Sequence, residues 1–374
     1  MEAKSKRSRL EKYARKKLTS QFGVQFGEDL HQLSTAEITE LKKIRRRTYL
    51  KAGIAGALGI ILLYVPYHLW KDFLFPTSLV KLPFFEVSIE LEIEFLIYSV
   101  ILVVVEIAYL TIVNVNVVSQ IAHACGCPNP NDPHYESSVN ALIAVGLEKK
   151  QKELKSIGIN PFEGLSSAMV FLYQILLKLK AALSGFLLKV IVTKVLGRYV
   201  LRMFVDLAGI PIYAFWNIWG ARTIMNEARV RVMAPTLIGK FVEIIHHEFK
   251  DNIKFKELIY PALQTISISK RNFHYNHFLL ASTILNKHNV SLQTELEYND
   301  NFLNELAETD SETKRGIGKV IVFGILIDGR LSARERRYIN KLNDLKIVEY
   351  KVVQVNRWAK DYFEGKGLES FFAS

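Results

Sequence analysis

The chain has 374 residues, of which 49% are hydrophobic and 23% are charged, and its formal net charge is +12. This length allows more than one folded unit. The mean hydropathy of +0.12 is too low for a transporter built from many membrane spans. The two cysteines, Cys125 and Cys127, are one residue apart. Neighbours this close rarely form a disulfide without strain, so we expect reduced thiols.

Residues 1–48 form a basic segment that we expect on the cytoplasmic side. The first 50 residues contain 13 Lys/Arg and six Asp/Glu. Apolar side chains recur at helical spacing within 4–19, which predicts a short amphipathic helix. Two interpretations stay open for it. It either lies on anionic lipid headgroups, where each basic residue adds about 1 kcal/mol, or forms a solvated, partly disordered tail.

Two apolar segments, at about 51–70 and 95–118, predict a transmembrane hairpin over 49–119. Each is long enough to cross a hydrocarbon core of about 30 Å, which requires about 20 helical residues. The second segment contains one charged residue, Glu106. We therefore expect an integral membrane protein whose two spans are joined by an extracytoplasmic loop at 71–94.

Charge predicts the orientation of this hairpin, because an excess of Lys and Arg marks the cytoplasmic flank of a span. Six basic residues lie against the first span: Lys42, Lys43, Arg45, Arg46, Arg47 and Lys51. The loop 71–94 instead has two lysines and five acidic residues. We expect a multi-pass protein of the inner (plasma) membrane with both termini in the cytoplasm.

Small residues recur four apart in the first span, at Ala52 and Gly56, Gly53 and Ala57, and Ala55 and Gly59. Such pairs let helix backbones approach closely in a membrane. We expect the second span of the same chain as the partner. A homo-oligomer formed through the first span is the alternative.

Local patterns predict the ends of the two spans. Ser34 and Glu37 form a capping-box pattern that would begin a helix leading into the first span. Pro66 predicts a kink near its outer end. Strict alternation over 87–95 favours a short extended segment, with an amphipathic helical turn as the alternative.

Residues 120–236 predict a membrane-proximal amphipathic helical region. Lys194, Arg198, Arg202 and Asp206 fall at steps of four and predict a polar stripe. The segment 203–219 is apolar enough for a third span, but basic residues flank it on both sides. We therefore favour an interfacial or re-entrant position. A helix over 221–233 is expected to stop before Pro235.

Glu106 lies near the middle of the second predicted span, where an ionisable group is costly. It is a candidate intramembrane functional residue, for example in a proton relay or ion path. Its alternative role is structural, as a protonated carboxyl bonded to the first span or to a copy of itself. Two spans alone do not enclose a transport path, so the structural role is favoured.

Metal and cofactor chemistry is not predicted. Four residues of types that bind metal ions lie close together: His123, Cys125, Cys127 and His134. However, one residue separates the two cysteines, whereas two to four usually separate the cysteines of a zinc site. Three prolines explain this segment as a tight connector. Walker A, G-x-G-x-x-G, G-x-S-x-G and kinase motifs are missing from the sequence, so we expect no enzyme activity. The basic clusters adjoin apolar segments, which favours lipid headgroups over nucleic acid as their partner.

A motif at 324–342 combines Asp328, Gly329, Ser332 and Glu335. These residues match the second half of a calcium loop, but the first two ligand positions hold Gly324 and Leu326, so calcium binding is not expected. The physical prediction is a helix–turn–helix corner. Gly329 would take a positive φ, and a capping box of Ser332 and Glu335 would begin the second helix.

This motif resembles the signature of tellurite-resistance TerB-like helical domains, specifically over about twenty residues and loosely across 237–374. The resemblance implies a cytoplasmic all-α module of the kind attached to bacterial membrane-associated stress systems. The overall layout also resembles that of uncharacterised bacterial multi-pass membrane proteins. This chain differs from the TerB-like pattern where acidic ligands are expected, because its corner is basic at Arg330, Arg334, Arg336 and Arg337.

The sequence thus predicts an all-α protein with a membrane hairpin and cytoplasmic helical domains. We expect a non-enzymatic interaction or stress-response protein that binds protein partners through residues 237–374. A transport or channel component using Glu106 is the alternative.

Overall fold

The computed structural model describes residues 8–19, 32–81, 88–127, 135–148, 159, 209–271, 274–291 and 299–374. Helices dominate the described residues, as the all-α prediction requires. They are accompanied by one antiparallel ribbon of two short strands, β1 (Ser78–Lys81) and β2 (Ser88–Leu91). Its register pairs Ser78 with Leu91 and Lys81 with Ser88.

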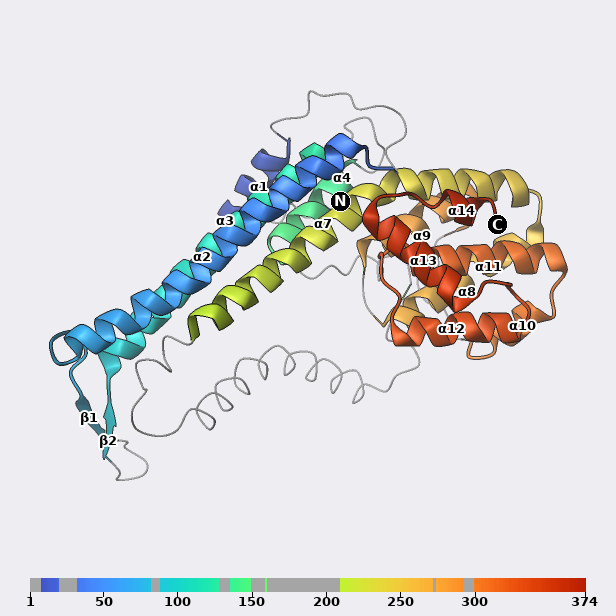
Figure 1. Cartoon of the computed structure of the whole chain (residues 1–374). Coiled ribbons are helices and arrows are strands. Elements are labelled where there is room, and N and C mark those ends of the chain that lie inside the picture. Colours follow the sequence, from blue (N-terminus) through green and yellow to red (C-terminus); the bar gives the residue numbers. More distant parts are fainter. Residues whose placement is uncertain are drawn as a thin grey trace. The chain divides into compact units, whose positions relative to one another are not determined.

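The chain divides into two compact units (Figure 1). The hairpin unit comprises Lys42–Val117 and Phe171–Met225. The bundle unit comprises Met1–Leu41, Val118–Val170 and Asn226–Ser374.

The hairpin unit is built on α2 (Thr35–Leu74) and α3 (Ile93–Ala124). Both helices are long and apolar enough to cross a membrane. Large apolar side chains are exposed along them, including Ile54, Leu58, Leu62, Val100, Val104 and Ile107. Apolar surface of this extent is unfavourable in contact with water and favourable in contact with lipid tails.

Local predictions at the helix ends are confirmed in part. The backbone N–H of Ser34 donates to Glu37 Oε2 at 2.6 Å, and the N–H of Glu37 donates to Ser34 Oγ at 3.2 Å, so the capping box exists. Strand β2 confirms an extended conformation over Ser88–Leu91. The alternation continues to Phe95, but α3 already begins at Ile93, so the end of that segment is helical.

The expected kink lies later than Pro66. Helix α2 continues through this proline, and the irregular backbone occurs at Trp70, with φ −133° and ψ 32°. Proline removes the N–H that would bond the carbonyl of Leu62. That carbonyl instead accepts a hydrogen bond from the hydroxyl of Tyr98 on α3, which satisfies it within the pair of helices.

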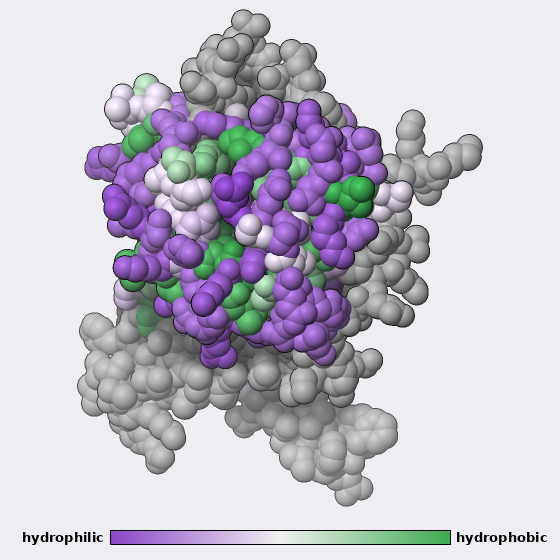
Figure 2. Space-filling view, turned by 90° about the vertical axis from the view of Figure 1, so that its right-hand side faces the viewer, coloured by the Kyte–Doolittle hydropathy of each residue, from purple (hydrophilic) through white to green (hydrophobic). Residues whose placement is uncertain are grey.

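The bundle unit contains short helices around a large apolar core. They are α1 (Arg9–Thr19), α4 (Tyr135–Gly146), the part of α7 (Gly209–Phe249) from Asn226 onward, α8 (Ile253–Lys270), α9 (Tyr275–Lys287), α10 (Phe302–Ala307), α11 (Ser311–Leu326), α12 (Ala333–Asp344), α13 (Val352–Glu364) and α14 (Glu369–Phe372). Helix α11 packs against α8, α12 and α13 (Figure 1). The rings of Phe241 and Phe323 stack with centroids 3.8 Å apart. The face of this unit seen in Figure 2 is mainly hydrophilic.

Helix α7 does not stop before Pro235, so that prediction is wrong. The helix runs through this proline to Phe249. Ala234, Leu237 and Ile238 are fully buried in the core. Burial on both sides of Pro235 outweighs the loss of one backbone hydrogen bond.

The predicted amphipathic helix near the N-terminus exists as α1, but its apolar face contacts protein. Ala14 and Leu18 are buried, and α1 packs against α4. Arg15 forms an ion pair with Glu136 on α4. Neither a lipid surface nor a solvated tail therefore describes the environment of this face.

Candidate functional site

Glu106 on α3 is half-buried and lies against two other helices of the hairpin unit, α2 and α7. The side-chain amide of Asn217 on α7 donates to Glu106 Oε1 at 2.7 Å. On α2, a Cβ added to Gly59 would lie 3.2 Å from Glu106 Oε2. The carboxyl of Glu106 therefore fills the space that the missing side chain of Gly59 leaves, and α7 supplies its hydrogen-bond donor.

The small residues of α2 accommodate α7 as well as α3. A Cβ on Gly56 would lie 2.6 Å from the backbone oxygen of Tyr213, and one on Gly53 would lie 3.1 Å from the side chain of Ile218. Only glycine permits so close an approach of two backbones at Gly56. The expectation that this face packs on the second span holds at Gly59 but not at Gly53 and Gly56.

The first part of α7 was not expected beside both helices of the hairpin. Its residues 209–221 carry no charge, and their aromatic side chains are exposed: Tyr213, Phe215, Trp216 and Trp219. Residues 165–208, which include the predicted polar stripe and the beginning of the segment 203–219, lie outside the described residues. The described part of that segment packs within the hairpin unit.

The chemistry available at Glu106 is limited. Its one hydrogen bond among the described residues comes from a neutral amide, and no described Lys, Arg or His forms an ion pair with it. A proton or ion path requires a succession of polar groups. Within the described part of the hairpin unit, the geometry around Glu106 is that of a polar contact between helices.

The Asp-Gly corner of the bundle unit has the predicted geometry. Gly329 has φ +71°, a conformation that favours glycine. The N–H of Ser332 donates to Glu335 Oε2 at 2.7 Å, and the N–H of Glu335 donates to Ser332 Oγ at 3.3 Å. Asp328 Oδ1 accepts from the N–H of Arg330 at 3.0 Å. All four motif residues therefore belong to one corner between α11 and α12.

A lysine that sequence reasoning missed completes this corner. Lys270, the last residue of α8, places Nζ 2.6 Å from Asp328 Oδ2 and pairs with Glu335. The same ammonium donates to the carbonyl of Ile325 at 2.9 Å. The side chains of Lys270 and Glu335 are 4% and 3% exposed, so this ion pair is buried.

The ammonium of Lys270 therefore stands among oxygen atoms, as a metal ion would in a calcium loop. This ammonium neutralises the carboxylates of the corner from within the chain. That agrees with a calcium pattern whose first two ligand positions hold Gly324 and Leu326. Because Lys270 is 58 residues before Asp328, no local spacing in the sequence links the two.

A second polar cluster lies between α7 and α9. Glu227 Oε1 lies 2.8 Å from Arg231 Nε and 2.9 Å from His274 Nε2. The backbone N–H of Asn276 donates to His274 Nδ1, which places the ring proton on Nε2 toward the carboxylate. Burial alone would raise the pKa of Glu227, but His274 and Arg231 together hold it well below its usual range.

Asn276 joins three helices by its side chain. Its amide donates to the carbonyl of Ile327 at 2.6 Å and to that of Val230 at 3.3 Å. The Val230 carbonyl also accepts from the hydroxyl of Tyr362 at 2.7 Å. Since Asn276 and Tyr362 are buried, these bonds hold the middle of α7 and the end of α11 together in the core.

The described part of the His–Cys segment after α3 ends at Cys127, and both of its cysteines are buried. Cys125 is 3% exposed, and burial, reinforced by neighbouring Cys127, raises the pKa of its thiol to about 12. A thiol with this pKa is protonated at neutral pH. His134 lies outside the described residues. Among those described, no three His, Cys, Asp or Glu side chains gather as a metal site would require.

Comparison with protein-family models, with curated proteins and with solved structures finds no match to this chain.

Proposed function

We propose that this protein is a membrane-anchored, non-enzymatic interaction or stress-response protein that presents its bundle unit to the cytoplasm. The observation that carries the proposal is the contrast between the two units. Apolar side chains are exposed along α2 and α3, whereas apolar side chains of the bundle unit form a closed core under a hydrophilic face (Figure 2). The first surface suits lipid and the second suits water.

The proposed topology has both termini in the cytoplasm of a cell whose inner (plasma) membrane the hairpin crosses twice. Six basic residues between Lys42 and Lys51 support this orientation, because such residues remain on the cytoplasmic side. They also suit the anionic headgroups of that leaflet, where each adds about 1 kcal/mol of attraction.

The proposed anchor contains more than the hairpin. The backbone contact between Gly56 and Tyr213 and the bond between Asn217 and Glu106 attach the first part of α7 to α2 and α3. This part of α7 exposes aromatic rings, which are enriched where a helix meets the membrane interface.

We also propose that the bundle unit is of the TerB-like kind and binds protein partners. The helix–turn–helix geometry of Asp328, Gly329, Ser332 and Glu335 supports the resemblance on which this rests. The ammonium of Lys270 among these carboxylates argues against carrying over a metal-dependent role.

Transport through the membrane is the second candidate, and the ionisable Glu106 favours it. Substitution at Glu106 separates the two functions. Glu106→Gln keeps an oxygen that accepts from Asn217, whereas Glu106→Leu leaves the amide of Asn217 without this acceptor. If Glu106 is structural, Gln preserves thermal stability in micelles and Leu lowers it. Loss of a proton or ion flux from proteoliposomes in the correctly folded Gln variant would instead support transport.

Cysteine accessibility tests the topology directly. Phe73, near the end of α2, and Val353 on α13 are 84% and 81% exposed, so Phe73→Cys and Val353→Cys give accessible probes. Both are made in a Cys125→Ser, Cys127→Ser background and labelled in intact cells with a membrane-impermeant maleimide. We expect labelling at residue 73 only. Labelling at residue 353 from outside would overturn the proposed orientation.

A further inference from the structure

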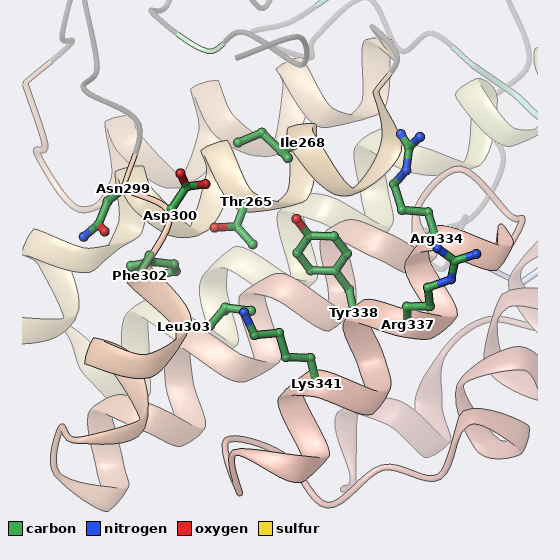
Figure 3. Close-up of a pocket in the computed structure, with 10 residues that line it drawn as sticks. All are labelled: Thr265, Ile268, Asn299, Asp300, Phe302, Leu303, Arg334, Arg337, Tyr338 and Lys341. Carbon is green, nitrogen blue, oxygen red and sulfur yellow. The ribbon is translucent and has the colours of Figure 1, made fainter. Parts of the chain in front are cut away.

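A pocket of about 390 Å³ opens in the bundle unit between α8, α12 and the residues that lead into α10 (Figure 3). Helix α12 supplies Arg334, Arg337, Tyr338 and Lys341 to its lining. Pockets of about 300–1,000 Å³ are typical of small-molecule sites. None of the residues that line it is one of the four motif residues of the Asp-Gly corner, and none belongs to the hairpin unit.

The side chains that line the pocket carry a net positive charge. Arg334, Arg337 and Lys341 follow one another at steps of three and four along one face of α12. None of the three forms an ion pair with a described residue, whereas elsewhere in this unit Lys287 pairs with Glu243 at 2.6 Å. Asp300 is the one carboxylate among the residues that line the pocket. Three cations and one carboxylate leave a net charge of +2.

The remaining lining is suited to the body of a ligand. Phe302 and Leu303 supply apolar surface, and the carboxylate of Asp300 can accept bonds from hydroxyls. The amide of Asn299 is engaged within the chain, because it donates to Glu305 and accepts from the N–H of Asn301. Figure 3 shows the ring of Tyr338 between the arginines on one side and the Asn299–Asp300 segment on the other. Burial raises the pKa of Tyr338, so its hydroxyl is protonated at neutral pH and can donate.

We propose that this pocket binds the phosphate ester of a small hydroxylated molecule. A phosphomonoester carries a charge of about −1.5 to −2 at pH 7, which balances the pocket. Arginine is the preferred partner of phosphate because its planar guanidinium offers two parallel donors. A monocarboxylate would leave half of the excess positive charge uncompensated. The ester end contacts α12, and the hydroxylated body lies against Phe302 and donates a bond to Asp300.

Two sources supply this chemistry, a soluble sugar or nucleoside phosphate and a phosphorylated lipid headgroup. The proposal goes beyond the interaction function argued above, since it concerns a small ligand of the bundle unit. It does not depend on the orientation of the hairpin, so failure of the topology experiment leaves it standing.

The test uses the full chain in micelles of an uncharged detergent, titrated with ribose 5-phosphate by calorimetry. Ribose without phosphate and inorganic phosphate are titrated in parallel. We expect ribose 5-phosphate to bind more tightly than either, and its affinity to fall as salt rises. Equal binding of inorganic phosphate and ribose 5-phosphate would overturn recognition of the hydroxylated body. No binding of ribose 5-phosphate would overturn the whole proposal, because the lipid experiment reads the binding of the same compound.

Substitutions connect the binding to the pocket. Arg334→Gln with Arg337→Gln removes two charged donors, and we expect a loss of affinity of about ten- to a hundredfold. Arg330→Gln is the matched control, because Arg330 is exposed on the adjoining corner but does not line the pocket. Thermal unfolding confirms that both variants are folded. The control removes one charge and the double variant two, so a control loss half as large in free energy would show attraction to net charge only and would overturn the site.

The source of the ester is distinguished in nanodiscs of phosphatidylcholine with or without phosphatidylinositol 4-phosphate. If this lipid weakens the binding of ribose 5-phosphate to the unsubstituted chain but not to the Arg334→Gln, Arg337→Gln variant, the pocket binds a lipid headgroup. Unchanged binding assigns it to a soluble phosphate. Both results support the phosphate chemistry of the pocket.

Discussion

The hydroxyl of Tyr98 on α3 donates a 2.7 Å hydrogen bond to the backbone carbonyl of Leu62 on α2, four residues before Pro66. A proline at position 66 cannot bond that carbonyl, and a membrane interior offers no water to replace it. One side chain of the second apolar helix therefore compensates for a proline in the first.

We predict that Tyr98→Phe lowers the stability of the hairpin by about 1 kcal/mol, the usual contribution of a hydrogen bond between membrane helices. Unfolding in mixed micelles, followed by circular dichroism, measures the change. Tyr109→Phe on the exposed side of α3 is the control and should have little effect.

A double-mutant cycle with Pro66→Ala makes this prediction specific. Alanine restores the N–H that bonds the Leu62 carbonyl within α2, so Tyr98→Phe should cost much less in that background. Additive effects of the two substitutions would contradict compensation between Tyr98 and Pro66.

Gly56→Ala should weaken the packing of α7 on α2. The new Cβ would lie 2.6 Å from the backbone oxygen of Tyr213, and a backbone atom cannot move aside as a flexible side chain can. We expect a loss of about 1–3 kcal/mol in the same unfolding experiment, as for other overpacked sites. Gly220→Ala is the control, because nothing lies within 4 Å of a Cβ there. It should be neutral or slightly stabilising.

Sequence reasoning succeeded where the determinants are local. Ser34 with Glu37, and Ser332 with Glu335, each form a capping box within four residues, so their spacing alone is sufficient. The two long apolar helices were predictable for the same reason, since length and hydropathy belong to one continuous segment.

Contacts between distant segments could not be predicted in this way. Nothing near Glu106 in the sequence points to Asn217, and nothing near Asp328 points to Lys270. The helix through Pro235 was missed because the local preference against proline is weaker than burial of its neighbours in a core built by other helices. In each case the missing information is tertiary.

Lys270→Met should strongly destabilise the bundle unit. It leaves the carboxylates of Asp328 and Glu335 without their buried counter-charge, and breaking such a pair costs about 3–5 kcal/mol. Hydrogen exchange of peptides from α11 and α12 measures the effect. Lys254→Met provides the control on the same helix, because the Lys254–Glu257 pair is exposed and should contribute less than about 1 kcal/mol. Equal exchange in the two variants would refute the role of Lys270.

Mild acid should destabilise the bundle unit through two buried histidines. Burial, followed by the charges of Lys270 and His274, holds the pKa of His277 well below 6.5. Burial, followed by His246, Lys256 and Lys287, lowers that of His288 to about 4. The unfolded chain takes up protons below about pH 6.5, whereas the folded chain does not. Stability is therefore complete above that pH and falls between it and about pH 4.

His288 alone should account for a loss of about 2 kcal/mol at pH 5. Urea unfolding at pH 7 and pH 5 measures this loss in the full chain. His288→Leu should reduce the difference between the two pH values, whereas His247→Leu, at an exposed position of α7, should not. If His288→Leu leaves the pH dependence unchanged, the proposed origin is wrong.

The internal ammonium of Lys270 has a consequence for how this protein matures. A corner closed by a metal ion cannot be completed until the ion is captured, so its folding varies with the supply of that ion. Here the cation is a side chain of α8, which precedes in the sequence the two carboxylates that it joins. The turn between α11 and α12 thus needs no captured metal ion to neutralise its two carboxylates.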